Sequence, residues 1–104
     1  MKNILIVSST KNSNYQLSNE IKDFFDYKKN ISSSVISLEE FDLPLYNPSL
    51  EEKFIQNKSF PDDIEKVKNL ILQTDALIWC SPEYNGGISP ILTNVIAWIS
   101  RTTN

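Results

Sequence analysis

Two short runs of apolar residues constrain the fold of this chain most strongly: Ile4-Leu5-Ile6-Val7 and Ala76-Leu77-Ile78-Trp79-Cys80. Uninterrupted runs of this length are typical of strands that are buried on both faces of a parallel sheet. Parallel strands need a crossover connection, usually a helix, and the chain between the two runs is long enough for more than one. An α/β fold is therefore expected.

Helical patterns separate and follow these runs. Core-facing positions recur at three- and four-residue steps in three stretches, as on one side of an amphipathic helix. They are Leu17, Ile21, Phe24 and Phe25 in the first stretch, Ile64, Val67, Ile71 and Thr74 in the second, and Leu92, Val95, Ile96 and Ile99 in the third. Ser13 with Gln16 predicts a capping box at the first helix, while Pro61 and the pair Ser89-Pro90 mark the starts of the other two.

A weaker strand is predicted at 35–38, and residues 39–60 are expected to form a long loop. Pro44 and Pro48 exclude a regular helix through it, although 51–56 can form a helical turn. The order is then β-α-β-α-β-α within a single domain, 1–104, which predicts parallel strands and right-handed crossovers. Doubly wound sheets of the flavodoxin type order their strands 2-1-3-4-5, so this chain is expected to form only the N-terminal portion, 2-1-3.

Charge and composition exclude several functional classes. A net charge of -3 disfavours nucleic acid or an anionic membrane as the main partner, because both require a basic face. The chain has no histidine and a single cysteine, Cys80, so a disulfide framework and a thiolate metal site are excluded. Any chemistry is then expected to belong to a cofactor. The first apolar run is too short for a signal peptide or a membrane span, which predicts a cytoplasmic protein.

Two polar loops are the candidate binding segments. The first, Ser8 to Gln16, places hydroxyls, amides and Lys11 between a strand and a helix N-terminus, where backbone N–H groups can bind a phosphate. The alternative is that Ser13 or Asn14 merely caps the helix. The loop contains no glycine and matches neither a P-loop nor a GxGxxG motif.

The second loop, Ser81 to Pro90, follows the buried run that ends at Cys80. Gly86 and Gly87 allow the backbone to approach a ligand closely, and Tyr84 offers an aromatic face. The alternative is a simple turn at Asn85-Gly86. Glu83 is a poor candidate for a catalytic acid because no histidine or second carboxylate accompanies it. Cys80 itself is expected to be a small core residue.

A family resemblance rests on the second loop and the helix after it. Pro82-Glu83-Tyr84-Asn85-Gly86, followed by Pro90, Leu92, Asn94 and Trp98-Ile99-Ser100-Arg101, resembles the signature of the NADPH-dependent FMN reductase family. That family includes flavodoxin-like quinone, chromate and azo-dye reductases. Leu43-Pro44-Leu45-Tyr46-Asn47 is also similar to the family's loop after strand 2.

The resemblance implies bound FMN, with NAD(P)H as reductant and a small electron acceptor such as a quinone. Its phosphate-binding residues would be Ser9, Lys11, Ser13, Asn14 and Gln16. Its ring-binding residues would be Pro82, Glu83, Tyr84, Asn85 and Gly86.

Several departures from the family pattern are visible. Ser8 replaces a common glycine, Lys11 a common arginine and Ala97 a common aspartate. Family members also continue through two more strands and a third loop.

Two other functional classes stay open. One is a truncated, non-catalytic remnant or interaction module that binds FMN weakly or not at all. Its third strand, 76–80, would be an unprotected edge, and such edges pair with other copies, so a homo-oligomer (dimer or tetramer) is expected. The other is an electron carrier like flavodoxin, whose glycine-containing phosphate loop is not matched by Ser8 to Asn14.

Overall fold

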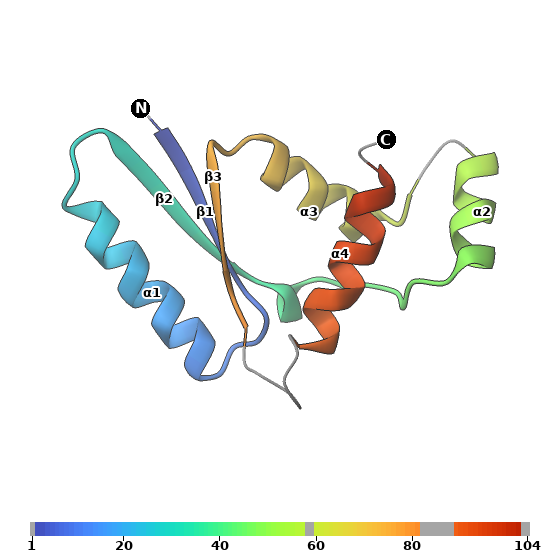
Figure 1. Ribbon diagram of the computed structural model, residues 1–104, viewed down its shortest axis with the longest axis horizontal. Coiled ribbons are helices and arrows are strands. Elements are labelled where there is room, and N and C mark those ends of the chain that lie inside the picture. Colours follow the sequence, from blue (N-terminus) through green and yellow to red (C-terminus); the bar gives the residue numbers. More distant parts are fainter. Residues whose placement is uncertain (1, 58–59, 82–88, 103–104) are drawn as a thin grey trace.

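The structure is a computed structural model that describes residues 2–57, 60–81 and 89–102. Strands and helices alternate along the chain (Figure 1). The elements are β1 (Lys2–Ser8), α1 (Ser13–Asp26), β2 (Ile31–Ser37), the 3₁₀ turn η1 (Leu38–Glu40), α2 (Pro48–Gln56), α3 (Asp62–Leu72), β3 (Ala76–Cys80) and α4 (Pro90–Thr102).

The three strands form one parallel sheet in the order β2-β1-β3. The register sets Leu5 of β1 beside Ser34 of β2 and Leu77 of β3. The predicted order 2-1-3 is therefore confirmed, and it is the N-terminal portion of a flavodoxin-like doubly wound sheet. The central strand is the most buried of the three, because β1 has a neighbouring strand on both sides.

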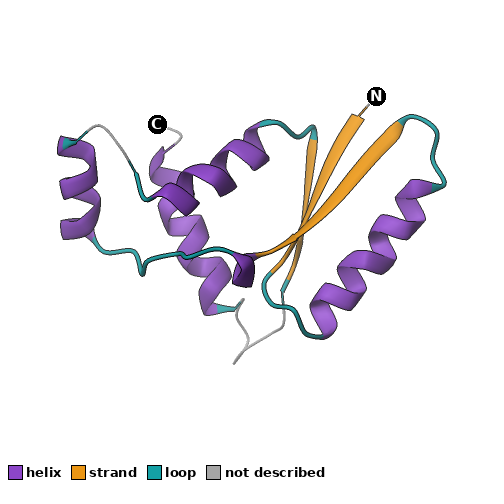
Figure 2. Ribbon diagram, turned by 180° about the vertical axis from the view of Figure 1, so that it is seen from behind, coloured by secondary structure: helices purple, strands orange, loops and turns teal. Residues whose placement is uncertain are grey.

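Helices cover both faces of the sheet, with α1 on one face and α3 and α4 on the other (Figures 1 and 2). The main core lies between the sheet and α3 and α4. Its buried members are Leu5, Val7, Leu38, Val67, Leu92 and Val95. Burying a side chain of this size stabilises the folded state by about 1.5–3 kcal/mol relative to leaving it exposed. This layer is therefore a main source of the stability of the fold.

Burial differs from the sequence prediction on two helices. On α1, Leu17 and Phe24 are 47% and 59% exposed, whereas Ser18 is fully buried. On α4, Ile96 is 42% exposed, and Trp98 takes the predicted core place. The physical reason is that each helix contacts the sheet along a narrow stripe, and apolar residues beside that stripe find no covering element among the described residues.

The middle segment is more ordered than its prolines suggested. Strand β2 begins at Ile31, four positions before the prediction, and Leu38 belongs to η1. Pro48 lies in the first turn of α2, where a missing N–H costs nothing, and the Asn47 side chain accepts a hydrogen bond from Leu50 N–H at 2.7 Å. Pro48 therefore starts a helix instead of preventing one, and the predicted long loop over 39–60 is wrong for 48–56.

A polar clamp fixes this segment to α4. The Pro44 carbonyl accepts hydrogen bonds from Asn94 Nδ2 and Trp98 Nε1, both at 2.9 Å. Asn94 Oδ1 in turn accepts from Tyr46 N–H at 2.6 Å. The Trp98 ring meets Tyr46 and Phe54 edge-on, with ring centroids 5.1 and 6.4 Å apart. Asn94 and Trp98 lie one turn apart, so a single face of α4 holds the whole segment.

Candidate functional site

The candidate site lies at the carboxyl edge of the sheet. Since all three strands are parallel, β1, β2 and β3 end there together at Ser8, Ser37 and Cys80 (Figure 1). Open α/β sheets bind ligands outside this edge, where neighbouring crossovers leave in opposite directions. The chain leaves β1 toward α1 on one face, and β3 is followed by α4 on the other face.

Serine residues anchor each of the two loops at this edge. Ser9 N–H donates to the Cys80 carbonyl at 2.9 Å, which attaches the first loop to the end of β3. Ser89 N–H donates to Ser81 Oγ at 3.0 Å. The hydroxyls of Ser9 and Ser89 are buried and have no hydrogen-bond partner among the described residues. A buried hydroxyl without a partner costs about 1–3 kcal/mol, so each is a candidate ligand-binding group.

The N-terminus of α1 lacks a side-chain cap. The N-cap residue is Asn12, its side chain makes no capping hydrogen bond, and the first turn has no acidic residue. The predicted capping box is therefore wrong: Ser13 is the first helical residue, and Gln16 N–H donates to Asn12 O. An uncapped N-terminus with no acidic residue in its own first turn leaves the positive end of the helix dipole available to an anion.

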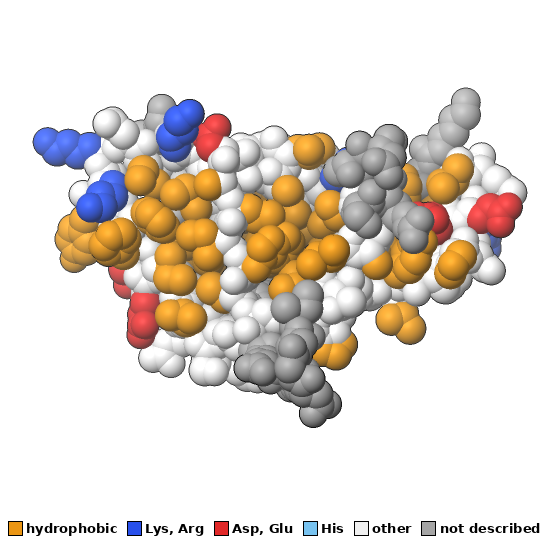
Figure 3. All heavy atoms as spheres, in the orientation of Figure 1, with side chains coloured by type: hydrophobic (Ala, Val, Ile, Leu, Met, Phe, Trp, Pro, Cys, Tyr) orange, Lys and Arg blue, Asp and Glu red, His pale blue; other side chains and the backbone are white. Residues whose placement is uncertain are grey.

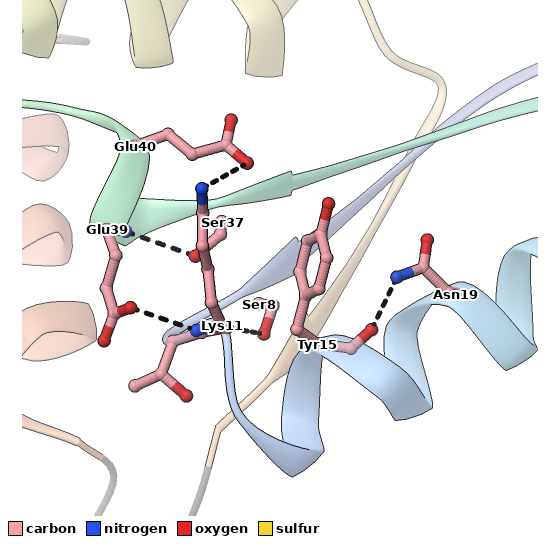
Figure 4. A network of polar contacts seen from close by, with 8 residues as sticks. Ser8, Lys11, Tyr15, Asn19, Ser37, Glu39 and Glu40 are labelled. Carbon is pink, nitrogen blue, oxygen red and sulfur yellow. Dashed lines mark hydrogen bonds and ion pairs between the residues drawn. The ribbon is translucent and has the colours of Figure 1, made fainter.

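Two carboxylates from η1 lie close to the same loop, and sequence reasoning missed them. Lys11 N–H donates to Glu39 Oε2 at 3.2 Å, and Lys11 Nζ lies 3.9 Å from Glu40 Oε1. Figure 4 shows the Lys11 side chain turned toward η1 and the Glu39 carboxylate turned back toward the loop. The available signal was their position directly after β2, because β2 ends at the same edge as β1.

The structure brings the five predicted residues of the first loop to one end of α1. Ser9 is buried and Asn14 half-buried, while Lys11, Ser13 and Gln16 are exposed. The predicted residues of the second loop, Pro82, Glu83, Tyr84, Asn85 and Gly86, lie outside the described residues. The prediction that Cys80 is a small core residue is confirmed, since it is buried at the end of β3.

Among the described residues, no group of three His, Cys, Asp or Glu side chains could hold a metal. A hollow of about 160 Å³, lined by Asn3, Ser32 and Thr74 among others, lies at the opposite edge of the sheet, and none of the predicted site residues line it.

In the part of the chain that the structure describes, no helix is long and apolar enough to cross a membrane.

The FMN phosphate can be tested against these residues. In its favour are the Ser9 hydroxyl, which has no partner among residues 2–57, 60–81 and 89–102, and the uncapped end of α1. Against it are the two nearby carboxylates and the pairing of Lys11 with one of them. Lys11 and Glu40 are exposed, and an exposed ion pair contributes only about 0–1 kcal/mol, so Lys11 can leave Glu40 at little cost. The atoms of the loop therefore fit a phosphate.

The fold has clear structural relatives. The flavoenzyme NAD(P)H:(acceptor) oxidoreductase FerB from Paracoccus denitrificans superposes with a TM-score of 0.72 at 21% identity, over 94% of this chain and 50% of that chain. An azoreductase from Bacillus anthracis also gives a TM-score of 0.72, at 15% identity, over 95% of this chain and 55% of that one. At these identities the likeness concerns the fold.

Sequence relatives agree with the structural ones. An Arabidopsis thaliana NADPH:quinone oxidoreductase is 39% identical over 62 residues, which cover 60% of this chain and 30% of that protein. A Pseudomonas aeruginosa NAD(P)H-dependent FMN reductase is 36% identical over 59 residues, covering 57% and 29%. The matched part is thus under a third of the length of these curated relatives. The family model described as NADPH-dependent FMN reductase matches residues 1–104. This chain therefore belongs to the NADPH-dependent FMN reductase family.

Proposed function

We propose that this chain binds FMN, with the phosphate at the N-terminus of α1, and serves an oxidoreductase that transfers hydride from NAD(P)H to the flavin and then to a small acceptor such as a quinone. Membership of the family supports the cofactor and the reductant. The names of the matched relatives, quinone oxidoreductase among them, support the acceptor class. The chain spans about half the length of its solved structural relatives. We therefore propose the hydride transfer for the enzyme to which this chain contributes.

The Ser9 hydroxyl, which is buried and has no hydrogen-bond partner in the described part of the chain, is the observation that carries this proposal. A buried hydroxyl without a partner destabilises the folded state, and an alanine at this position would remove that cost. The presence of serine therefore favours a role in ligand binding. Its backbone is held by the Cys80 carbonyl, so the group is positioned before any ligand arrives. Hydrogen bonds to a charged phosphate are worth about 1.5–3 kcal/mol each.

The other residues have supporting roles in this proposal. Ser13 and Asn14 open α1 and would present hydroxyl, amide and backbone N–H groups to the phosphate. Lys11 would exchange its contact with Glu40 for one with the phosphate. The loop from Pro82 to Gly86 would contact the ring, as the family resemblance implies. FMN supplies the hydride chemistry when bound, so no side chain of the protein has to act as the redox group. The absence of histidine from the chain agrees with this role of the cofactor.

Titration with FMN and with riboflavin, followed by flavin fluorescence and absorbance, tests the proposal. Riboflavin has the same ring and no phosphate. We expect Ser9→Ala to weaken FMN binding about 10- to 100-fold, the equivalent of about 1.5–3 kcal/mol, and to leave riboflavin binding unchanged. The same substitution should keep or raise the melting temperature, since it removes an unsatisfied buried group.

Ser34→Ala, at an exposed position of β2, is the matched control and should change neither ligand's affinity. Protein that stays free of FMN at millimolar ligand would refute flavin binding and favour the remnant hypothesis. Bound FMN that NADPH does not reduce would support binding and refute the oxidoreductase part. An equal loss of FMN and riboflavin affinity in Ser9→Ala would place the phosphate elsewhere.

A further inference from the structure

The proposed function leaves the Ser89 hydroxyl without a role. Ser89 is 2% exposed, and its Oγ is buried with no hydrogen-bond partner among residues 2–57, 60–81 and 89–102. An unpaired buried hydroxyl costs about 1–3 kcal/mol, which an alanine at this position would avoid. Bulk water does not reach the atom, so it is a candidate to bind a ligand or an enclosed water molecule.

Ser89 directly precedes α4, at the position where a serine normally caps a helix. The helix begins at Pro90, and the Ser89 carbonyl accepts hydrogen bonds from Thr93 N–H at 3.0 Å and Thr93 Oγ1 at 3.1 Å. A capping serine also accepts, through its Oγ, from an N–H group of the first turn. Ser89 Oγ makes no such bond within the described residues, and the first turn has no acidic residue. The positive end of the α4 dipole is therefore available to a negatively charged group.

The backbone on both sides of this hydroxyl is held in place. Ser89 N–H donates to Ser81 Oγ at 3.0 Å, while the Ser89 carbonyl accepts the two bonds from Thr93. Pro90 restricts the backbone at the next position. The helix itself is anchored in the main core through Leu92, which is 3% exposed. The hydroxyl is thus positioned before a ligand arrives, and binding does not have to order it.

The helices α1 and α4 both begin at the carboxyl edge of the sheet, one on each face. Figure 1 shows their N-terminal ends at the bottom of the view, where the three strands end. The α1 end follows the Ser9 hydroxyl, to which the FMN phosphate is assigned above. The residues assigned to the ring by the family resemblance, Pro82 to Gly86, lie between Ser81 and Ser89 in the sequence. The ring is therefore the part of the ligand that fits the α4 end.

We infer that the Ser89 hydroxyl and the N-terminus of α4 bind the acceptor atoms of the flavin ring and favour the reduced flavin over the oxidised one. This inference rests on the proposed function. Hydride transfer converts NAD(P)H to NAD(P)⁺ and adds one proton and two electrons at flavin N5, so the ring gains one negative charge, at N1 and the C2 carbonyl. The Ser89 O–H and the positive helix end interact more strongly with that charge than with the neutral ring.

The reduction potential of the bound flavin tests this inference. Ser89→Ala should lower the affinity for reduced flavin about tenfold more than the affinity for oxidised flavin, because a hydrogen bond to a charged group is about twice as strong as one to a neutral group. For a two-electron couple, a tenfold change lowers the midpoint potential by about 30 mV. FMN and riboflavin should show the same shift, because the contact is with the ring that they share.

Ser49→Ala is the matched control, since it removes an exposed hydroxyl from the first turn of α2 and should leave the potential unchanged. Without flavin, Ser89→Ala should keep or raise the melting temperature, because it removes an unsatisfied buried group. If Ser89→Ala does not fold by circular dichroism, Ser89→Gly provides the test, since glycine is well tolerated directly before a helix.

Four results would overturn the inference. Bound flavin with the same potential in the parent and in Ser89→Ala would leave an enclosed water molecule as the partner of the hydroxyl, while the proposed function would stand. A loss of FMN affinity without a loss of riboflavin affinity would show that Ser89 binds the phosphate. A melting temperature several degrees lower in flavin-free Ser89→Ala would show that the hydroxyl supports the fold. Protein that binds neither flavin would refute the proposed function as well.

Discussion

Replacing Glu39 by glutamine should tighten FMN binding. Glu39 Oε2 lies 3.2 Å from Lys11 N, so its carboxylate occupies one backbone donor of the proposed phosphate loop. A phosphate that accepts from a neighbouring N–H would carry its charge roughly 6 Å from this carboxylate, where two unit charges in water repel by about 0.7 kcal/mol. A phosphate with nearly two charges doubles this, and about 1.4 kcal/mol is a tenfold change in affinity.

The expected result is therefore about tenfold tighter FMN in Glu39→Gln, measured by fluorescence titration at low salt. The gain should shrink at 1 M salt, where charges are screened within about 3 Å. Riboflavin should bind Glu39→Gln and the parent equally, because it carries no phosphate. Glu52→Gln on α2 removes the same charge from an exposed helix position and controls for net charge.

One outcome would refute this reasoning. If Glu39→Gln binds FMN more weakly, then the hydrogen bond from Lys11 N–H to Glu39 holds the loop in its binding conformation. The carboxylate would then be a structural support of the site and not a competitor of the phosphate. Equal gains for FMN and riboflavin would instead show that the charge acts on the ring or on the fold.

Two further predictions concern stability. Trp98→Phe removes the Nε1–H bond to Pro44 O and leaves the Asn94 bond in place, so urea unfolding should show a loss of about 1–2 kcal/mol; a change below 0.3 kcal/mol would mean that ring packing alone holds the segment. The Asp42 N–H bond lowers the pKa of Asp63, so its contribution is present at neutral pH and is lost as the pH falls through the folded-state value. The difference in melting temperature between the parent and Asp63→Ala should therefore shrink below about pH 4, and a difference that grows on acidification would contradict that sign.

Much of the sheet could be predicted from the sequence because its signals are local. The runs ending at Val7 and Cys80 are strands in the structure, and the alternation of strands and helices determines the order β2-β1-β3. Membership of β2 was harder to predict, because Ser32, Ser33 and Ser34 lack the apolar pattern of a strand. They are held in the sheet by backbone pairing to β1, a contact that no local pattern encodes.

The site was predicted less completely, because part of it depends on contacts between residues far apart in the sequence. The residues of the first loop share one stretch of sequence, so Ser9, Ser13 and Asn14 could be grouped from the strand-to-helix pattern. Glu39 and Glu40 reach the same loop only through the register of β1 and β2, which requires the fold. The prediction of the buried face of α1 was wrong at Leu17 for the same reason. The exposure of Leu17 depends on which elements lie beside α1, and helical periodicity does not contain that information. Figure 3 shows how hydrophobic side chains gather across the middle of one face of the molecule, with charged side chains mainly at its margins.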